Sequence, residues 1–278
     1  MVSKHTNLSL LLWLSFSFLS EAAVLTDFDG NGLDYTEAAF RGAPVGSVVG
    51  GGPAGNYYNL LNNVGDAGNN IAFPATGTAG WQTATLSMDI RARNIEADGF
   101  GIGFVDVATH GNDLVRPGTG GFGDVEERYL LSNSVGVGFR TFNGTNATVS
   151  YDGQESADVA YNLPSGEWVP VQISMVRSGG GAILNATLDG QSVFTDYVLE
   201  GAPDDFRIQI GGRTGGASMD LDIDNVSLEV EIAEPPAPIG LVINEFVASS
   251  ENSLEDEDLD NPDWIELYNG QDLSLIHI

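Results

Sequence analysis

The chain has 278 residues, of which 42% are hydrophobic, and its 39 acidic and 10 basic side chains give a formal net charge of −29. This length and composition favour a folded chain with a buried core over a disordered one. Such an acidic surface repels the phosphates of nucleic acids and anionic lipid head groups, because binding to either depends on Lys and Arg. The absence of cysteine excludes disulfides, thiol catalysis and Cys-ligated metals.

Residues 1–22 have the composition of a secretory signal peptide. Lys4 precedes an apolar or hydroxyl-bearing run at 8–19, and Ser20 and Ala22 are the small residues that signal peptidase reads. The run is shorter than the roughly 20 apolar residues of a membrane-spanning helix, so an uncleaved anchor is the less favoured alternative. The sequence predicts a secreted protein, extracellular or at the cell surface, with no membrane-spanning segment in the mature chain.

The middle of the chain has the two-residue polarity period of half-buried β-strands. In residues 83–93 the even positions are apolar and the odd positions are polar. Similar alternation recurs at 169–175 and 182–188, and Asp-Gly and Gly-Gly-Gly turn sequences separate the runs. No window has a sustained helical period. The prediction is an all-β sandwich in which the 36 glycines serve many tight turns.

Residues 207–230 predict a closing pair of strands joined by a Gly-rich turn. Apolar residues occupy odd positions up to Ile223 but even positions from Val226, so the buried face changes in between. A β-bulge near Asp224-Asn225 would return the second half of the strand to the core. The alternation also places three acids on the opposite face: Asp220, Asp222 and Asp224.

A proline-rich segment, residues 233–240, separates the predicted sandwich at 23–232 from a second unit at 241–278. Prolines remove amide donors and favour an extended linker. The second unit has two predicted strands, and two strands cannot bury a core alone. We therefore expect a truncated domain, and residues 273–278 match a translated sequencing adapter, so that we interpret this end as artefactual.

Two motifs resemble those of the concanavalin A-like lectin/glucanase superfamily, with a similarity that covers roughly residues 24–232. The first is ADGFGIGF at 97–104, and the second is RTGG at 213–216 followed by IDNV at 223–226. The resemblance implies a jelly-roll β-sandwich of the L-type lectin-like or LamG-like kind.

The resemblance also implies a sugar site. In L-type lectins of this superfamily an Asp in an Ala-Asp-Gly turn accepts hydrogen bonds from a sugar, a Gly-rich loop offers an amide, and a calcium ion orders the site. Asp98 matches that Asp, and aromatic side chains would serve as platforms for a pyranose. A turn residue with no ligand is an equally favoured interpretation of Asp98. The predicted ligand-binding residues are Asp98, Gly99, Gly121, Phe122, Phe142 and Asn143.

The residues that would bind calcium in a lectin of this superfamily are not all present. Residues 135–143 resemble the lectin strand that supplies acidic metal ligands, but Gly138 and Arg140 stand where Glu and Asp are expected. Calcium is the one cofactor that the sequence suggests, and two other acidic patterns are candidate calcium sites. The first is the loop with Asp27, Asp29 and Asn31, which we interpret as a turn without a metal in preference to a calcium site. The second is the row of Asp220, Asp222 and Asp224 on one strand face, called the aspartate ladder below. We expect these three carboxylates to be solvated in preference to binding calcium.

No pattern predicts an enzyme. Glucanases of the superfamily carry Glu-x-Asp-x-x-Glu or Glu-x-Asp-x-Glu on one strand, and this chain has neither. Glu126 and Glu127 are adjacent and would point to opposite faces of an extended strand. His110 lies in a turn-like context without a nucleophile elbow.

Residues 241–270 resemble the start of a lamin-tail domain of bacterial exported proteins, through INE at 243–245 and DWIEL at 263–267. The resemblance implies an immunoglobulin-like sandwich that acts in attachment or targeting and carries no catalytic residue. The whole chain then predicts an exported, non-catalytic module that binds a glycan or another cell-surface polymer. The alternatives are a structural spacer in a surface protein and, less favoured, a glycoside hydrolase or lyase.

Overall fold

The structure is a computed structural model that describes residues 18–40, 46–117, 125–233, 241–247 and 264–269. Within these ranges no helix has the length and apolarity that a membrane crossing requires. Residues 1–17 of the predicted signal peptide, the linker at 234–240 and residues 270–278 lie outside the described part. Residues 18–22 belong to the first strand, in which Glu21 pairs with Val230 and Ala22 with Glu229.

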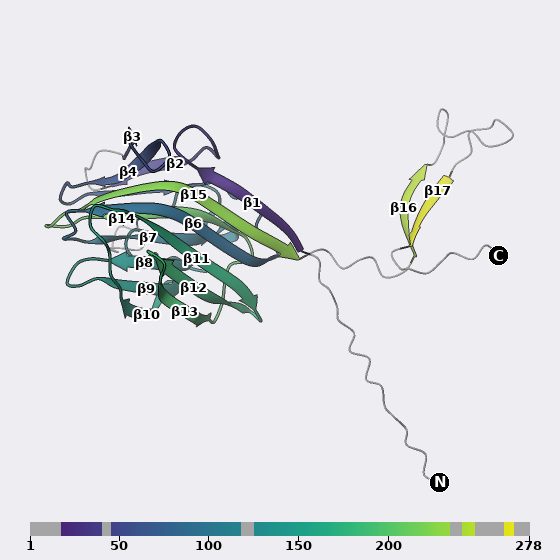
Figure 1. Cartoon of the computed structure of the whole chain (residues 1–278). Helices are drawn as coiled ribbons and strands as arrows, with labels where there is room; N and C mark the ends of the chain where they lie inside the picture. Colours follow the sequence, from purple (N-terminus) through teal and green to yellow (C-terminus); the bar gives the residue numbers. More distant parts are fainter. Residues whose placement is uncertain (1–17, 41–45, 118–124, 234–240, 248–263, 270–278) are drawn as a thin grey trace, which may run out of the picture. The chain divides into compact units, whose positions relative to one another are not determined.

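Two antiparallel sheets form the sandwich (Figure 1). Among the described residues, one sheet has eight strands in the order β13-β12-β11-β6-β15-β4-β3, and β1 also pairs with β15. Its strands are β1 (Phe18–Thr26), β3 (Ser47–Gly50), β4 (Asn56–Asn62), β6 (Trp81–Arg93), β11 (Trp168–Ser178), β12 (Gly181–Leu188), β13 (Gln191–Leu199) and β15 (Asp220–Ala233).

The other sheet has seven strands in the order β10-β9-β8-β7-β14-β5-β2 within the same described ranges. Its strands are β2 (Thr36–Phe40), β5 (Gly68–Ala72), β7 (Gly99–Asp106), β8 (Val135–Arg140), β9 (Asn146–Tyr151), β10 (Gln154–Ala160) and β14 (Phe206–Arg213). One helical turn, α1 (Val107–His110), follows β7. Separately, β16 (Leu241–Val247) and β17 (Trp264–Asn269) form an antiparallel pair. The all-β prediction is confirmed.

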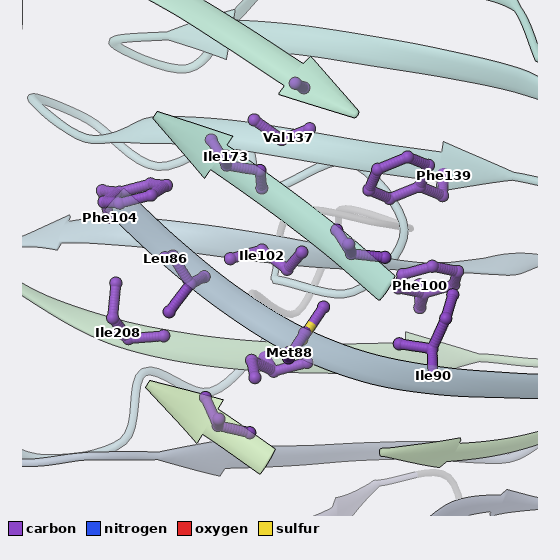
Figure 2. Close-up of a cluster of buried hydrophobic side chains, with 14 of the residues drawn as sticks. Leu86, Met88, Ile90, Phe100, Ile102, Phe104, Val137, Phe139, Ile173 and Ile208 are labelled. Carbon is purple, nitrogen blue, oxygen red and sulfur yellow. The ribbon is translucent and has the colours of Figure 1, made fainter. Parts of the chain in front are cut away.

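The core lies between the two sheets and follows the predicted alternation. On β6 the even-numbered apolar residues from Ala84 to Ala92 are buried, as are the corresponding residues of β11 and β12. Figure 2 shows Leu86, Met88 and Ile90 of β6 in one cluster with aromatic and aliphatic side chains of β7 and β8. Each such side chain stabilises the fold by about 1.5–3 kcal/mol on full burial, so this core is the main source of stability in a chain without disulfides.

The predicted β-bulge in β15 is confirmed. The register between β15 and β6 shifts between Asp224 and Ser227, and Asn225 has a φ of 50°. Because of this shift Ile223 and Val226 are both buried on the core side. At the same point β15 changes its other neighbour, from β4, where Ile223 pairs with Tyr58, to β1, where Val226 pairs with Thr26.

Candidate functional site

A connecting segment lies on the outer face of the seven-stranded sheet, the face turned away from the core. Its apolar residues Val125, Tyr129 and Leu131 form a second small cluster with Val105 of β7. The Tyr129 hydroxyl donates a hydrogen bond of 3.0 Å to Asn70 Oδ1 on β5. We call residues 125–131 the covering segment, because they bury part of this sheet face from solvent.

Glycines in the middle of the strands allow the covering segment to approach the sheet. A Cβ atom on Gly101 would lie 2.8 Å from the Tyr129 ring, and one on Gly138 would collide with the Glu127 carbonyl. Gly103 and Gly136 are also placed directly beneath Tyr129. The interpretation of the glycines as turn residues is therefore incomplete, since these four lie inside β7 and β8 and leave room for another stretch of backbone.

Arg213, the last residue of β14, gathers three carboxylates at the end of this face. Its Nη2 and Nε atoms lie 2.6 Å and 2.9 Å from the two carboxylate oxygens of Glu127, a bidentate pair. Its Nη1 lies 3.2 Å from Asp98 Oδ2, and its Nε lies 3.7 Å from Glu126 Oε2. We call these four residues the Arg213 cluster; in it Asp98, Glu126 and Glu127 are all buried.

The surroundings of Arg213 favour its charged form. Burial works against the charge of Arg213, but the hydrogen bonds and charge of Glu127, followed by the charges of Asp98 and Glu126, outweigh it and raise the pKa of Arg213. The expectation that Glu126 and Glu127 point to opposite faces applied to an extended strand, whereas residues 125–127 form a turn. Both side chains consequently reach the same guanidinium group.

Four of the six predicted ligand-binding residues meet at one edge of the sandwich. The Asp98 amide donates to the Arg213 carbonyl at 2.9 Å, and the Asp98 carbonyl accepts from the Thr141 amide at 2.8 Å, so that Phe142 and Asn143 follow directly beside Asp98. Phe142 is 52% exposed. Gly99, the fourth of these predicted residues, is the first residue of β7 and pairs with Arg140 of β8.

The backbone at this edge has two unusual features: the Ala97-Asp98 peptide bond is cis, and Asn143 has a φ of 60°. A Cβ atom on Gly215 would lie 2.9 Å from Asp98 Oδ2, so glycine at this position leaves space beside the carboxylate. We call Asp98, Thr141, Phe142, Asn143 and Gly215 the Asp98 rim. Gly121 and Phe122, the other two predicted residues, lie outside the described residues.

The first calcium candidate forms a hydrogen-bonded turn. Asp27 Oδ1 accepts hydrogen bonds from the amides of Asp29 (2.9 Å) and Asn31 (3.1 Å), and its Oδ2 accepts one from Asn31 Nδ2 (2.6 Å). The hydrogen bond from the Asn31 side chain, followed by that from the Asp29 amide, lowers the pKa of Asp27. Asp27 and Asn31 thus bond to each other, while Asp29 Oδ1 accepts from the Asn56 amide at 2.9 Å.

The aspartate ladder is not uniformly solvated, which corrects the favoured interpretation. Asp222 is completely buried and lies 2.9 Å from both Arg91 Nε and Arg93 Nη2. Asp220 accepts a hydrogen bond of 2.8 Å from Asn94 Nδ2. Two arginines of β6 therefore neutralise the middle of the ladder. In the described part of the chain no three His, Cys, Asp or Glu side chains are grouped as a metal site would require.

Sequence reasoning singled out Asp98, Phe142 and Asn143 as candidates but missed the Arg213 cluster. Asp98 was found through its Ala-Asp-Gly motif, whereas Arg213 drew notice only as part of a Gly-rich motif. Glu127 and Arg213 are 86 positions apart. No local period or spacing relates them, and only the sheet order brings them together.

The sequence matches no protein-family model and no curated protein. Its fold is similar to that of several solved lectin-type structures. The VIP36 exoplasmic/lumenal domain in its Ca²⁺/Man2-bound form is 13% identical, with 78% of this chain and 90% of that chain covered and a TM-score of 0.52. Lectin UEA-II complexed with galactose is 11% identical, with 78% and 100% covered and a TM-score of 0.52. Arcelin-5, a lectin-like defense protein from Phaseolus vulgaris, is 12% identical, with 78% and 99% covered and a TM-score of 0.52. The chain therefore has the concanavalin A-like lectin fold.

Proposed function

We propose that the sandwich is a non-catalytic carbohydrate-binding module of a secreted or cell-surface protein, and that it binds a neutral glycan at the Asp98 rim. One observation carries the proposal: the Asp98 carboxylate is held by Arg213, and the Asp98 backbone is hydrogen-bonded to Thr141, the residue that precedes the exposed aromatic Phe142. A carboxylate accepts hydrogen bonds from sugar hydroxyls, and an aromatic ring packs against the apolar face of a pyranose.

The fold supports the same class of ligand. The VIP36 domain and UEA-II, which share the fold, were solved with Man2 and with galactose respectively. The net charge of −29 favours an uncharged ligand over an anionic one, because anions are repelled from so acidic a surface. A neutral saccharide therefore fits both the rim and the surface charge.

The Arg213 cluster argues for binding and against glycoside hydrolysis. Hydrolysis by a carboxylate pair needs one carboxyl group that is protonated and can donate to the leaving oxygen. Asp98, Glu126 and Glu127 all lie against the Arg213 guanidinium, and two oxygens of Glu127 are occupied by its bidentate contact. The three carboxyl groups are thus engaged with one arginine, an arrangement that does not present a free acid and a free base to a glycosidic bond.

The proposal predicts that Phe142→Ala weakens glycan binding about tenfold or more, because a buried aromatic contact contributes roughly 1–3 kcal/mol. The binding partner is first identified on a glycan array and the affinity is then measured by calorimetry on the purified chain. The melting temperature of this variant should be unchanged, since Phe142 is half exposed.

Two further variants should also weaken glycan binding. Asp98→Asn removes the charge of the carboxylate, and Gly215→Ala places a methyl group beside the Asp98 carboxylate.

A matched control comes from a surface cavity of about 450 Å³ elsewhere on the sandwich, lined in part by Tyr151, Gln154, Tyr197 and Val198. Tyr197→Ala should leave glycan binding unchanged. If instead Tyr197→Ala abolishes binding and Phe142→Ala does not, the glycan binds at that cavity and the Asp98 rim is the wrong site. If no glycan on the array binds the wild-type chain, the structural-spacer alternative replaces the proposed function.

A further inference from the structure

The strand β15 has different neighbours in its two halves, and a gap in pairing separates them. Up to Ile223 it pairs with β4, and from Val226 it pairs with β1 (Figure 1). The turn that follows β1 and the turn that precedes β4 are therefore brought to the same place. Asp224, at the bulge, lies where neither neighbour pairs with β15. We call this place, with Asp224, Asp29 and the turn at residues 50–55, the β1–β4 junction.

The carboxylate of Asp224 is buried with one oxygen unsatisfied. Its residue is only 1% exposed. Oδ1 accepts a hydrogen bond of 2.8 Å from the Asn225 amide, but Oδ2 is buried without a hydrogen-bond partner in the described part of the chain. A buried acceptor without a partner is costly, and more so when it is charged, so a group that the structure does not contain is expected beside it.

The unsatisfied oxygen faces the turn at residues 50–55. A Cβ atom on Gly52 would lie 2.6 Å from Asp224 Oδ2, and one on Gly55 would collide with the Asp29 carboxylate. The turn is closed by the amides of Gly51 and Gly52, which donate to the Gly55 carbonyl at 2.9 Å and 2.7 Å. Asp224 and Asp29, from opposite ends of the sequence, thus lie against one short turn.

The charge around Asp224 is negative. Asp89 of β6 is its direct cross-strand partner and accepts a hydrogen bond of 2.7 Å from Asn225 Nδ2. Asp29 and Asp27 add further negative charge close enough to act on Asp224. The arginines on this face, Arg91 and Arg93, pair with Asp222. These two arginines therefore neutralise Asp222 of the ladder and not the aspartates of the β1–β4 junction.

We propose that the β1–β4 junction binds one calcium ion, with Asp224 and Asp29 as carboxylate ligands. Calcium accepts six to eight oxygen ligands in flexible geometry, and backbone carbonyls and water are common among them. Two carboxylates, either of which can bind through both oxygens, satisfy this requirement when water completes the coordination, without a third acidic side chain. The ion neutralises the buried charge and connects three segments that pair with β15 or border it.

This site is distinct from the Asp98 rim and does not rest on the proposed function. Asp224 belongs to the eight-stranded sheet, whereas Asp98 precedes a strand of the seven-stranded sheet. The two sequence candidates for calcium were separate, one at 27–31 and one at 220–224. The structure places one acid of each against the same turn.

The test is calorimetric and thermal, on the whole chain after removal of metal with EGTA. Millimolar CaCl₂ is expected to raise the melting temperature by about 3 °C or more, because a ligand that binds only the folded state stabilises it by mass action. Asp224→Asn keeps the shape and removes the charge, and it is expected to abolish both the shift and the heat of calcium binding. Asp29→Asn should reduce both.

Asp220→Asn is the matched control, since Asp220 lies on the same strand but bonds to Asn94 and not to the turn. This variant should retain the full calcium shift. The proposal is overturned if calcium gives neither a shift nor heat with the wild-type chain, or if Asp224→Asn responds as strongly as the wild type does. A shift that only Asp220→Asn abolishes would place the ion on the ladder and would also overturn it. Glycan binding is not part of the readout, so the two proposals fail separately.

Discussion

Replacing Arg213 with methionine is expected to lower the free energy of unfolding by about 3–5 kcal/mol, the usual range when one partner of a buried ion pair is removed. Three buried carboxylates would then lie close together without their common counter-charge: Asp98, Glu126 and Glu127. Urea denaturation followed by tryptophan fluorescence measures the loss. Because the same guanidinium orients Asp98, glycan binding should also be lost under conditions where the variant is still folded.

The matched control is Arg116→Met, because Arg116 is exposed and contacts the Phe40 ring at 5.8 Å. It should change stability by less than about 0.5 kcal/mol. A double variant, Arg213→Met with Glu127→Gln, should recover part of the lost stability, since Glu127 makes the bidentate contact with Arg213. A loss below about 1 kcal/mol in Arg213→Met would mean that water or other groups neutralise the carboxylates and that Arg213 does not hold Asp98 in place.

The strands and the bulge could be predicted because they depend on local order in the sequence. Alternation in residues 83–93 specifies which face of β6 is buried whatever strand lies beside it. The change from odd to even apolar positions around Asp224 likewise requires an extra residue in the strand, and the register shift is found there. Both inferences use only neighbours along the chain, and both are confirmed.

Other features could not be predicted because they depend on pairs that only the fold brings together. Arg207 alternates as an outward-facing strand residue, yet it is 1% exposed, because its Nε donates to the Gly111 carbonyl at 2.8 Å beyond β7. Asp29 and Asp224 are almost 200 positions apart and meet only because β15 changes neighbours. From the polarity of their side chains alone, Arg207, Asp29 and Asp224 would all be expected on the solvent-exposed surface.

The glycines in the middle of β7 and β8 are explained by a segment that is distant from them in the sequence. Composition indicated tight turns, and a glycine inside a strand is locally unfavourable because it adds no side chain to the packing. Gly136 and Gly138 nevertheless alternate along β8, on the face opposite the core residues Val135, Val137 and Phe139. Their absent side chains are the space that the covering segment occupies.

Gly138→Ala is therefore expected to destabilise the sandwich by about 1–3 kcal/mol, the usual range for overpacking a tight contact. The added methyl group would meet the Glu127 carbonyl and lie 2.6 Å from Thr148 Oγ1, and neither can move without displacing backbone or a buried neighbour. Urea denaturation measures the loss.

Gly180→Ala is the control for this substitution, because Gly180 lies in the turn between β11 and β12 and a Cβ there would meet no atom within 4 Å. Its effect should stay within about 0.5 kcal/mol. If Gly138→Ala is equally harmless, the covering segment must lie farther from β8 than the structure places it. Glu127 would then not be held against Arg213, and the orientation of Asp98 would need another cause. The stability of Gly138→Ala thus tests the sheet face and the ligand rim together.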